Sequence, residues 1–342
     1  MYKKGFPMDR AGMDSLLDDP DVRDADLFLM ESTGLYHLPL YHYLLSRGRR
    51  ALIMNPVLVP GYKRSLSLRN TKTDRIDAKA IAAFGADCSD RLPKGKTEMD
   101  TESLIIARRR AENAREVAKA KTVPKQDLAA AFPELLSVDV FTGSMLRFLT
   151  AYGSAKDVLA ASDKDLEAAL RPAGKGRKAS LGVDELRRLA EGSVGVSLHG
   201  FCVRDSARRL LECLDRDRML TQALTASEES VHPREMEIVT SLPGIGKVEA
   251  AQFLAEVGDI RRFATYQKLV AYMGTDPSVY QSGQSSLHGR ISTHGDAVLR
   301  KYMFLMAKGS IAHNPVFRDY YRKKRAQTVT VNGQSLPRPH RK

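Results

Sequence analysis

The stretch "ADLFLMESTGLYHLPLYHYLLSRGRRALIMNPVLV", residues 25–59, decides the fold class that this sequence predicts. Its first apolar run, within 25–34, ends in Glu31 and a Ser-Thr-Gly turn, which predicts a short buried strand. Residues 35–48 then carry apolar side chains at helical spacing and stop at a glycine, and residues 49–59 form a second strand-like run. Strand, helix and strand in this order predict an α/β domain.

The next segment, "TKTDRIDAKAIAAFG" (71–85), predicts a helix that ends at Gly85 and begins with two acidic residues. Asp74 and Asp77 lie three positions apart, so they share a helix face and both carboxylates can reach one ion. Such a pair is also an ordinary helix start, because acidic residues in a first turn complement the helix dipole. Taken alone, the pair is more often structural than metal-binding.

Glu31 adds a third carboxylate to this pair. It sits at the carboxyl end of a predicted buried strand, where open α/β sheets bind their ligands. Phosphoryl-transfer sites that use two metal ions need several carboxylates in one place. The spacing therefore makes Glu31, Asp74 and Asp77 candidate metal ligands, although a glutamate at a strand end is otherwise usually just solvated.

Composition limits the function classes. The chain of 342 residues has a net charge of +13, and residues 288–342 hold twelve Lys and Arg against two acidic residues, which indicates a polyanion partner. No apolar run approaches the roughly 20 residues that cross a bilayer, and the start lacks a secretory signal. Three scattered cysteines, Cys88, Cys202 and Cys213, fit neither a disulfide framework nor a zinc site. We expect a cytoplasmic, nucleoid-associated protein with no membrane partner.

The middle of the chain has sparse apolar positions and dense charge. Helices are expected over residues 101–121, 155–171, 183–192 and 203–230. This combination of few apolar and many charged residues favours an extended helical hairpin or coiled coil of the kind that often serves as an oligomer arm.

A third region begins with "SLPGIGKVEAAQFLAEVGDIRRF" (241–263). Gly244 and Gly246 form a turn before a helix, which resembles a helix-hairpin-helix whose backbone N–H groups, with Lys247, would bind a phosphate. A plain turn between two packed helices is the alternative. Residues 274–292 are expected to form a Ser/Gly-rich loop and 296–312 a helix, and residues from 328 onward are expected to be disordered.

Five segments in this order carry a family resemblance: "MESTGLYHLPLYHYLLSRG", "NPVLVPGYKRSLSLRNTKTDRIDAKAIA", "LPGIGKVEAAQFLAEVGDIRRF", "YMGTDPSVYQSG" and "HNPVFRDYYRKKR". They resemble the IS110 family of insertion-sequence transposases. The resemblance implies an RNase H-like (RuvC-like) DEDD domain over 1–95, a helical coiled-coil arm over 96–231, a mainly α C-terminal transposase domain over 232–325 and a disordered basic tail over 326–342. It also implies recombination of double-stranded DNA by a homo-oligomer, guided by a bridge RNA.

The resemblance assigns roles to individual residues. Glu31, Asp74 and Asp77 match the family's Mg²⁺-binding acids. Ser282, in "YQSG", matches the serine that attacks DNA, and Ser278, Ser285 and Ser286 compete with it for this role. A further set of residues is expected to contact nucleic acid: Lys63, Arg64, Arg69, Lys72, Arg75, Gly244, Gly246, Lys247, Arg290, Arg300 and Lys301.

The sequence departs from the family at both ends. The family's first aspartate lies on an opening strand, and none of the seven aspartates between residues 9 and 26 follows an apolar strand. Near the other end, Pro337 and Pro339 exclude a further helix. We therefore expect a chain that lacks its opening strands and one metal ligand, binds nucleic acid and recombines poorly.

Two other functions fit the same residues. One is a nucleic-acid-binding transposase remnant that has lost catalysis. The other is a RuvC-type junction nuclease, in which a metal-activated water would cut DNA and Ser282 would not be needed.

Overall fold

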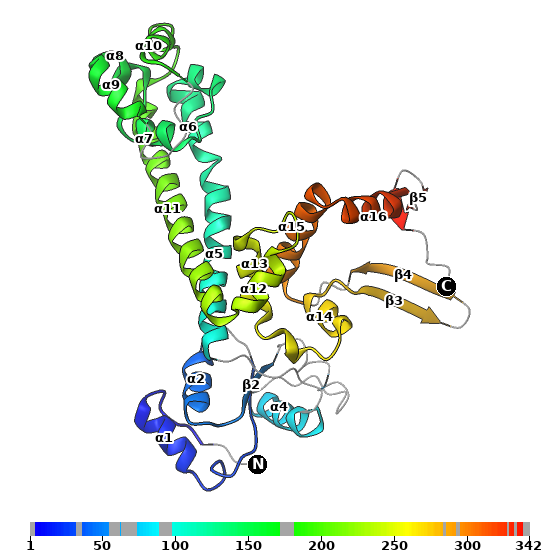
Figure 1. Ribbon diagram of the computed structural model, residues 1–342. Helices are drawn as coiled ribbons and strands as arrows, with labels where there is room; N and C mark the ends of the chain where they lie inside the picture. Colours follow the sequence, from blue (N-terminus) through cyan, green and yellow to red (C-terminus); the bar gives the residue numbers. More distant parts are fainter. Residues whose placement is uncertain are drawn as a thin grey trace. The chain divides into compact units, whose positions relative to one another are not determined.

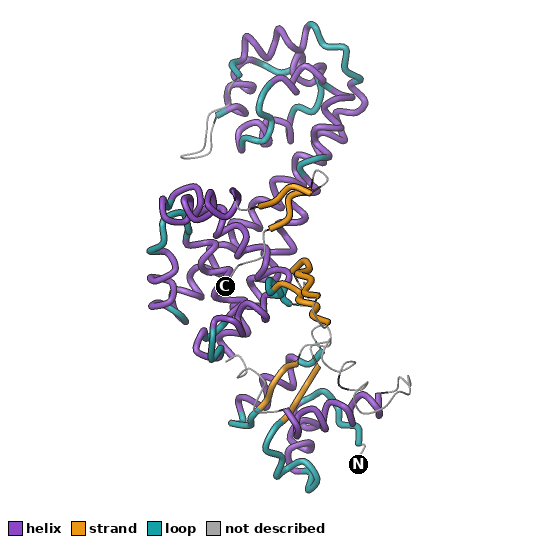
Figure 2. The backbone as a smooth tube through the Cα atoms, turned by 90° about the vertical axis from the view of Figure 1, so that its right-hand side faces the viewer, coloured by secondary structure: helices purple, strands orange, loops and turns teal. Residues whose placement is uncertain are grey.

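The computed structural model describes residues 4–31, 36–54, 62, 74–88, 98–171, 181–282, 285–291, 295–326, 328–331 and 334–337. The chain divides into two compact units. One unit combines Met1–Ile105 with Ser227–Lys342, and the other is Ile106–Ala226. Most of the described chain is helical, and the strands occur in short pairs (Figure 2).

The first unit begins with a small α/β layer (Figure 1). Strands β1 (Phe28–Glu31) and β2 (Ala51–Met54) pair in parallel, with Phe28 opposite Ala51 and Glu31 opposite Met54. A parallel pair needs a crossover, and helix α2 (Leu38–Ser46) lies between the two strands in the sequence. The predicted order of strand, helix and strand is confirmed, while two strands are too few to identify an RNase H-like sheet.

Helices cover both faces of this pair. On one face, Tyr41 and Leu44 of α2 pack with Phe28 and Met30, and Leu17 of helix α1 (Arg10–Asp18) joins them. On the other face, helix α4 (Asp74–Cys88) packs its Ala80, Ile81 and Phe84 against Leu29 and Met54. The alternation of side chains along β1 explains why neighbouring residues serve different helices.

The prediction that Gly85 ends its helix is wrong, because α4 continues to Cys88. Gly85 is buried inside the helix, and a Cβ at this position would lie 3.3 Å from Cδ2 of Leu29. The glycine therefore serves the close approach of α4 to β1 rather than a helix stop.

The second unit contains most of a long antiparallel helix pair, α5 (Glu98–Ala120) and α11 (Gly200–Val231). Asn113 is 3% exposed and donates from Nδ2 to the carbonyl of Cys213 at 2.9 Å. Nε of Arg110 donates to the hydroxyl of Thr221 at 2.7 Å. Polar contacts of this kind fix the register of paired helices. The helices expected over 101–121 and 203–230 are confirmed, while the coiled-coil oligomer arm stays a prediction.

Between α5 and α11 in the sequence, the second unit contains a helical bundle that the sequence pattern did not predict. Its core contains Phe132, Phe148, Leu166 and Leu186, all fully buried. The bundle consists of α6 (Val123–Ala131), η2 (Pro133–Ser137), α7 (Gly143–Ala151), α8 (Ala155–Ala160), α9 (Asp163–Leu170), α10 (Val183–Glu191) and η3 (Ser197–His199).

The single helix expected over 155–171 is wrong, because α8 and α9 are separate helices. Ser162 caps α9, with its hydroxyl accepting from the backbone N–H of Asp165 at 3.2 Å. The carbonyl of Ala161, at the break between α8 and α9, accepts a hydrogen bond from Nη2 of Arg187 at 2.6 Å. A side chain from α10 thus satisfies a backbone group that the helix end leaves without an intrahelical partner.

The C-terminal part of the first unit is mainly helical, as expected. Val257, Met273 and Leu299 form its core, and Asp296 caps α15 through the backbone N–H groups of Val298 and Leu299. Its helices are α12 (Pro233–Thr240), α13 (Lys247–Val257), η4 (Ile260–Arg262), α14 (Tyr266–Met273), α15 (Ala297–His313) and α16 (Pro315–Ala326).

Two segments that we expected to be irregular contain antiparallel ribbons, so both expectations are wrong for the residues in these strands, while residues 338–342 lie outside the described part of the chain. Strands β3 (Pro277–Ser282) and β4 (Ser285–Ile291) pair, as do β5 (Thr328–Val331) and β6 (Gln334–Pro337). Strands β3, β4 and β6 lack a regular alternation of apolar residues, and the Thr-Val alternation of β5 covers only four residues, so the strand pattern is weak in both ribbons.

Across the residues that the structure describes, no helix is both long enough and apolar enough to span a bilayer.

A buried charged cluster joins three helices of the first unit. His232, just before α12, lies between two carboxylates: its Nε2 is 3.0 Å from Oδ1 of Asp100 and its Nδ1 is 2.8 Å from Oε2 of Glu228. All three residues are less than 9% exposed. The hydrogen bonds to Asp100 and Glu228 raise the pKa of His232 to about 10, so the imidazole carries a charge at neutral pH.

We predict that His232→Gln destabilises the first unit by about 3 kcal/mol at pH 6, because it removes the positive charge that lies between two buried carboxylates. The folded-state pKa lies above the usual 6.5, so this contribution is complete below pH 6.5 and is lost as the pH rises through about 10. Urea unfolding between pH 6 and 10 should show the difference from the wild-type protein shrinking. Arg234→Gln, which breaks an exposed pair with Glu237, is the control and should cost less than about 1 kcal/mol. An equal effect of the two substitutions would contradict the assignment.

Candidate metal and nucleic-acid site

Glu31 is the last residue of β1, and it lies opposite Met54, the last residue of β2. Parallel strands end at one edge of a sheet, so both carboxyl ends meet at this point. Side chains alternate along a strand, which places Glu31 on the same face as Leu29. That is the face that α4 covers. The glutamate predicted from the sequence is therefore directed towards the helix that carries the two predicted aspartates.

Asp77 lies in the first turn of α4. It precedes Ala80 by three positions and Ile81 by four, so it shares the helix face that packs on the sheet. The direction of α4 follows from two contacts: Gly85 lies against Leu29, whereas Ala80 packs with Met54 at the strand's end. The helix therefore runs antiparallel to β1, and its first turn lies level with the carboxyl ends of both strands.

The arrangement brings Glu31 and Asp77 to the same edge of the sheet, and Asp74 begins the same helical turn. The Asp74 side chain lies outside the described part of the structure. Among the described side chains, no three His, Cys, Asp or Glu residues gather closely enough to hold a metal. The complete set of Glu31, Asp74 and Asp77 stays a prediction.

Three of the aspartates that precede β1 have structural partners. Asp9 caps α1 by accepting from the backbone N–H of Gly12 at 2.8 Å. Asp14 accepts from the hydroxyl of Tyr43 and from Arg47. Asp19 is buried and accepts from Nζ of Lys4 at 2.8 Å. That none of the aspartates in this segment replaces the family's first aspartate stays a prediction.

The glycine turn between α12 and α13 has a packing role. Gly244 has a φ of +92°, and a Cβ there would lie 2.2 Å from the carbonyl oxygen of Gly309 in α15. Gly246 caps α13, and a Cβ at that position would lie 2.8 Å from Oε2 of Glu249. Lys247 is paired with Glu229 at 2.6 Å. The turn is a close backbone contact between helices, and an acidic side chain lies beside the helix N-terminus where a phosphate was expected.

The structure describes the side chains of only some of the other residues that were predicted to contact nucleic acid. Lys63, Arg64, Arg69 and Lys72 lie outside the described residues. Arg75 is in α4 and Arg290 is in β4, with side chains that are also outside the description. Arg300 donates from Nη1 to the carbonyl of Met273 at 2.8 Å and so supports the end of α14. Lys301 is exposed, with Nζ 5.6 Å from the centre of the Tyr302 ring.

Ser282 is the last residue of β3, and it pairs with Ser285, the first residue of β4. Ser278 lies in β3, and Ser286 lies opposite Gln281. The backbone places all four candidate serines on one hairpin, while their side chains lie outside the described part of the structure. The choice of Ser282 as nucleophile stays a prediction.

Comparison with known proteins identifies the family. Residues 236–322 match the family described as "Transposase IS116/IS110/IS902 family", and residues 1–133 match the DEDD transposase domain of IS110. The chain belongs to the IS110 family of transposases. Its function class is therefore DNA transposition and recombination, which confirms the resemblance found in the sequence, and the DEDD domain suggests dependence on a divalent metal.

Individual relatives agree with this family. The "Pilin gene-inverting protein" of Moraxella bovis is 24% identical over 298 residues, which cover 86% of this chain and 70% of the relative. The "Mini-circle putative transposase for IS117" of Streptomyces coelicolor is 24% identical over 341 residues, covering 93% of this chain and 80% of the relative. The IS110 43.6 kDa protein of the same organism is 31% identical over 186 residues, 53% of this chain and 45% of the relative.

We predict that Gly244→Ala destabilises the fold by more than about 2 kcal/mol, because a Cβ meets the Gly309 backbone and the positive φ is unfavourable for alanine. Thermal unfolding monitored by circular dichroism measures the effect. Gly5→Ala is the control, since its Cβ would have no neighbour within 4 Å and should change stability by less than about 0.5 kcal/mol. If Gly244→Ala kept wild-type stability and instead lost nucleic-acid affinity, the phosphate-binding interpretation of the turn would hold.

Proposed function

We propose that this transposase cuts and rejoins DNA strands at an acidic site formed by Glu31, Asp74 and Asp77, with Ser282 as the nucleophile. The observation that carries the proposal is the placement of Glu31 and Asp77. They lie at the carboxyl edge of β1 and β2, on facing surfaces of the sheet and of α4. This edge is where open α/β sheets bind their ligands.

The donor set fits a hard divalent cation such as Mg²⁺, which prefers carboxylate oxygens. Glu31 and Asp77 are partly exposed rather than sealed in the core, so an ion and a DNA phosphate can reach them. Mg²⁺ bound by these acids would supply charge stabilisation for a phosphate under attack. The chain's own contribution is to hold the carboxylates on two packed elements, β1 and α4.

The attacking group would be the Oγ of Ser282. A bond forms between Oγ and the phosphorus, the bond from phosphorus to the leaving strand's oxygen breaks, and the serine proton passes to that oxygen. A serine hydroxyl is a weak nucleophile without activation, so this step needs the acidic site nearby. The serine lies on a different part of the chain from the acids, and a site shared between subunits of a homo-oligomer would satisfy this requirement.

The substrates would be double-stranded DNA at the ends of an element and at its target, with a guide RNA directing the choice of site. The Moraxella relatives are named for the inversion of a pilin gene, which supports a reaction that rejoins the strands it cuts. DNA inversion is therefore a second candidate outcome of the same chemistry.

We predict that Glu31→Gln and Asp77→Asn each reduce metal-dependent cleavage of element-end DNA by at least about 100-fold, because each removes a ligand charge. Each should also weaken Mn²⁺ binding measured by isothermal titration calorimetry, while nucleic-acid affinity persists. Asp87→Asn is the control, since Asp87 is exposed in the last turns of the same helix. Wild-type Mn²⁺ binding in both variants would argue against this acidic site.

The role of the serine has a separate test. Ser282→Ala should abolish the covalent protein–DNA adduct seen on denaturing gels, because alanine has no hydroxyl to form the bond. Ser278→Ala, Ser285→Ala and Ser286→Ala on the same hairpin are matched controls and should retain it. Cleavage that survives Ser282→Ala without an adduct would favour a junction nuclease that uses water. Binding without any cleavage by the wild-type chain would favour a non-catalytic remnant.

A further inference from the structure

Helix α16 (Pro315–Ala326) leaves its aromatic residues uncovered. The structure describes every side chain of this helix, and none of them is buried. Phe317, Tyr320 and Tyr321 are 43%, 60% and 46% exposed, and their spacing puts them on one helix face. An amphipathic helix normally turns such a face to a core. Here the face is open to a ligand.

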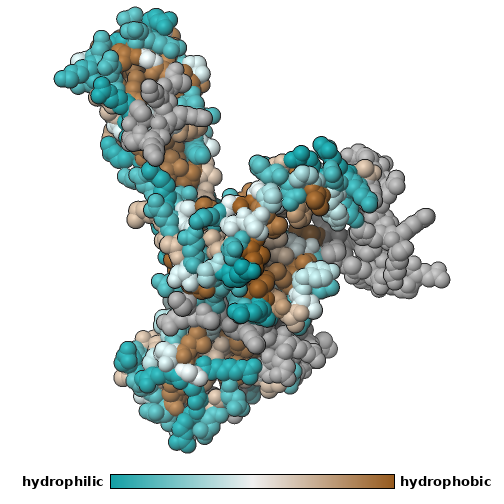
Figure 3. All heavy atoms as spheres, in the orientation of Figure 1, coloured by the Kyte–Doolittle hydropathy of each residue, from teal (hydrophilic) through white to brown (hydrophobic). Residues whose placement is uncertain are grey.

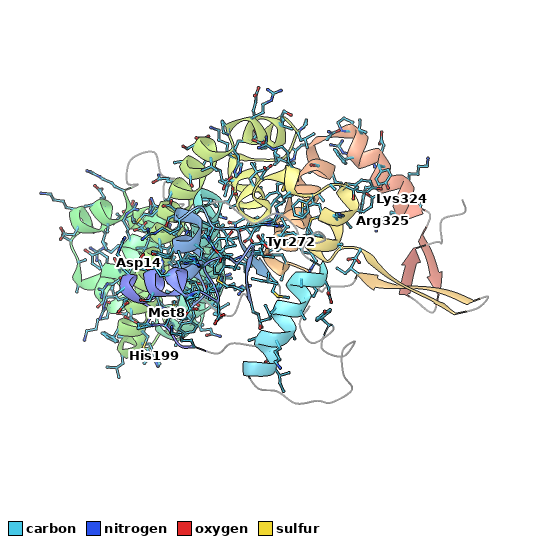
Figure 4. The ribbon with its side chains drawn as sticks, turned by 90° about the horizontal axis from the view of Figure 1, so that it is seen from below. Met8, Asp14, His199, Tyr272, Lys324 and Arg325 are labelled. Carbon is cyan, nitrogen blue, oxygen red and sulfur yellow. The ribbon has the colours of Figure 1, made fainter. Side chains whose placement is uncertain are left out.

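Cations follow the tyrosines directly. Residues 322–325 read Arg-Lys-Lys-Arg, and the one acid of the helix, Asp319, lies 3.8 Å from Arg322. Nζ of Lys324 lies 5.6 Å from the centre of the Tyr320 ring. Lys324 and Arg325 lie together at the end of α16 (Figure 4), and hydrophilic residues dominate this helix in the space-filling view (Figure 3). Rings and positive charges therefore share one short surface.

The helix is held in place by a residue that does not belong to this surface. Nε of Arg318 donates to the carbonyl of Ile311 at 3.3 Å, and its Nη2 donates to the carbonyl of Ala312. These bonds tie α16 to the end of α15. Arg318 is thus a structural cation, and the aromatic and basic residues beyond it are presented on a fixed helix.

We propose that α16 binds unpaired nucleotides, with bases stacked on Tyr320 and Tyr321 and phosphates bound by residues 322–325. The rings select an unpaired strand, because base faces are hidden inside a duplex but free in a single strand or loop. The charge selects a polyanion. A second copy of this chain is a poor occupant, because it has a net charge of +13 and would bring the same cations to the interface.

This proposal rests on the proposed function only in the class of its ligand, a nucleic acid. Binding at α16 needs neither a metal nor Ser282. It can therefore be measured in EDTA, where cleavage does not occur. Failure of α16 to bind would leave the acidic site untouched, and failure of the acidic site would leave this binding intact.

The test is fluorescence anisotropy of the full chain with three labelled probes: a 20-nucleotide oligo-dT, a 20-nucleotide oligo-U and a 20-base-pair duplex. Replacing both tyrosines, Tyr320→Leu with Tyr321→Leu, keeps apolar bulk but removes the rings. This change should weaken binding of both single strands by about tenfold or more and duplex binding by less than about twofold. Tyr320→Phe with Tyr321→Phe keeps the rings and should bind the single strands within about twofold of the wild-type protein.

Tyr266→Leu is the matched control, because Tyr266 is a 74% exposed tyrosine on α14 and should leave all three affinities unchanged. Lys323→Ala with Arg325→Ala gives a second, independent arm. It should reduce the slope of log Kd against log salt for the single strands by about 1.4, or about 0.7 for each cation removed, while keeping the preference for single strands. Tighter binding of oligo-U would identify RNA as the source of the strand, and equal affinities would mean that either strand is accepted.

The proposal fails if the leucine pair binds both single strands as well as the wild-type protein does. It also fails if single-strand and duplex binding fall together, or if the substitutions change the oligomeric mass in light scattering instead of the affinity. Circular dichroism checks that α16 stays folded. If α16 unfolds in the variant with Tyr320→Leu and Tyr321→Leu, the phenylalanine and charge variants decide whether the proposal holds.

Discussion

Parallel pairing of β1 with β2 is the constraint on which the candidate site depends. Two parallel strands must be joined by a crossover, and they must end at the same edge of the sheet. Because β1 ends at Glu31 and β2 ends at Met54, that edge carries a carboxylate beside an apolar side chain that anchors α4. The helix then runs back along the strand, so its first turn returns Asp77 to the same edge. A change of register by one residue would turn Glu31 to the other face, towards α2, and separate it from Asp77.

The sequence predicted the elements of the fold and of the candidate site that a local pattern determines. It did not predict those that a tertiary contact determines. The apolar runs around residues 28 and 52 predicted both strands, and the acids were placed correctly at a strand end and in a first helical turn. Gly85 was misread as a helix stop because its role is contact with Leu29, 56 residues earlier in the chain. The β3–β4 ribbon was not predicted because its strands lack alternating apolar residues, and the β5–β6 ribbon was not predicted because its Thr-Val alternation covers only four residues. The bundle core around Phe132 and Phe148 draws on distant segments, which a helix-by-helix inspection cannot assemble.

The glycine turn between α12 and α13 has a packing role in the structure. The sequence predicts a tight turn at Gly244 and Gly246 that offers N–H groups to a phosphate, with a plain turn between packed helices as the alternative. The structure provides a different neighbour, since Gly244 and Gly309 each occupy the space where the other's Cβ would lie. Gly274 and Gly295 form a second contact of the same kind, with a Cβ on Gly274 only 2.4 Å from the backbone nitrogen of Gly295. Two glycine pairs thus fix α15 against the turns that precede α13 and follow α14. In this part of the chain, helix packing accounts for the glycines, and phosphate binding at the turn stays a prediction.

The distribution of charge suggests where that binding lies. The described acids of the α/β layer are concentrated at the β1 edge and around α1, whereas the cations gather towards the C-terminal end. A transposase that held its substrate mainly through its metal site would couple affinity to catalysis, and loss of a carboxylate would release the DNA. Cations on α16 allow a different division, in which phosphates are bound through a salt-dependent surface and the acids act on a strand that is already held. The exposed tyrosines make that surface selective for unpaired nucleotides, the form in which a guide strand or an opened DNA end offers its bases. Affinity and chemistry are then carried by different parts of one chain, and each can change without destroying the other.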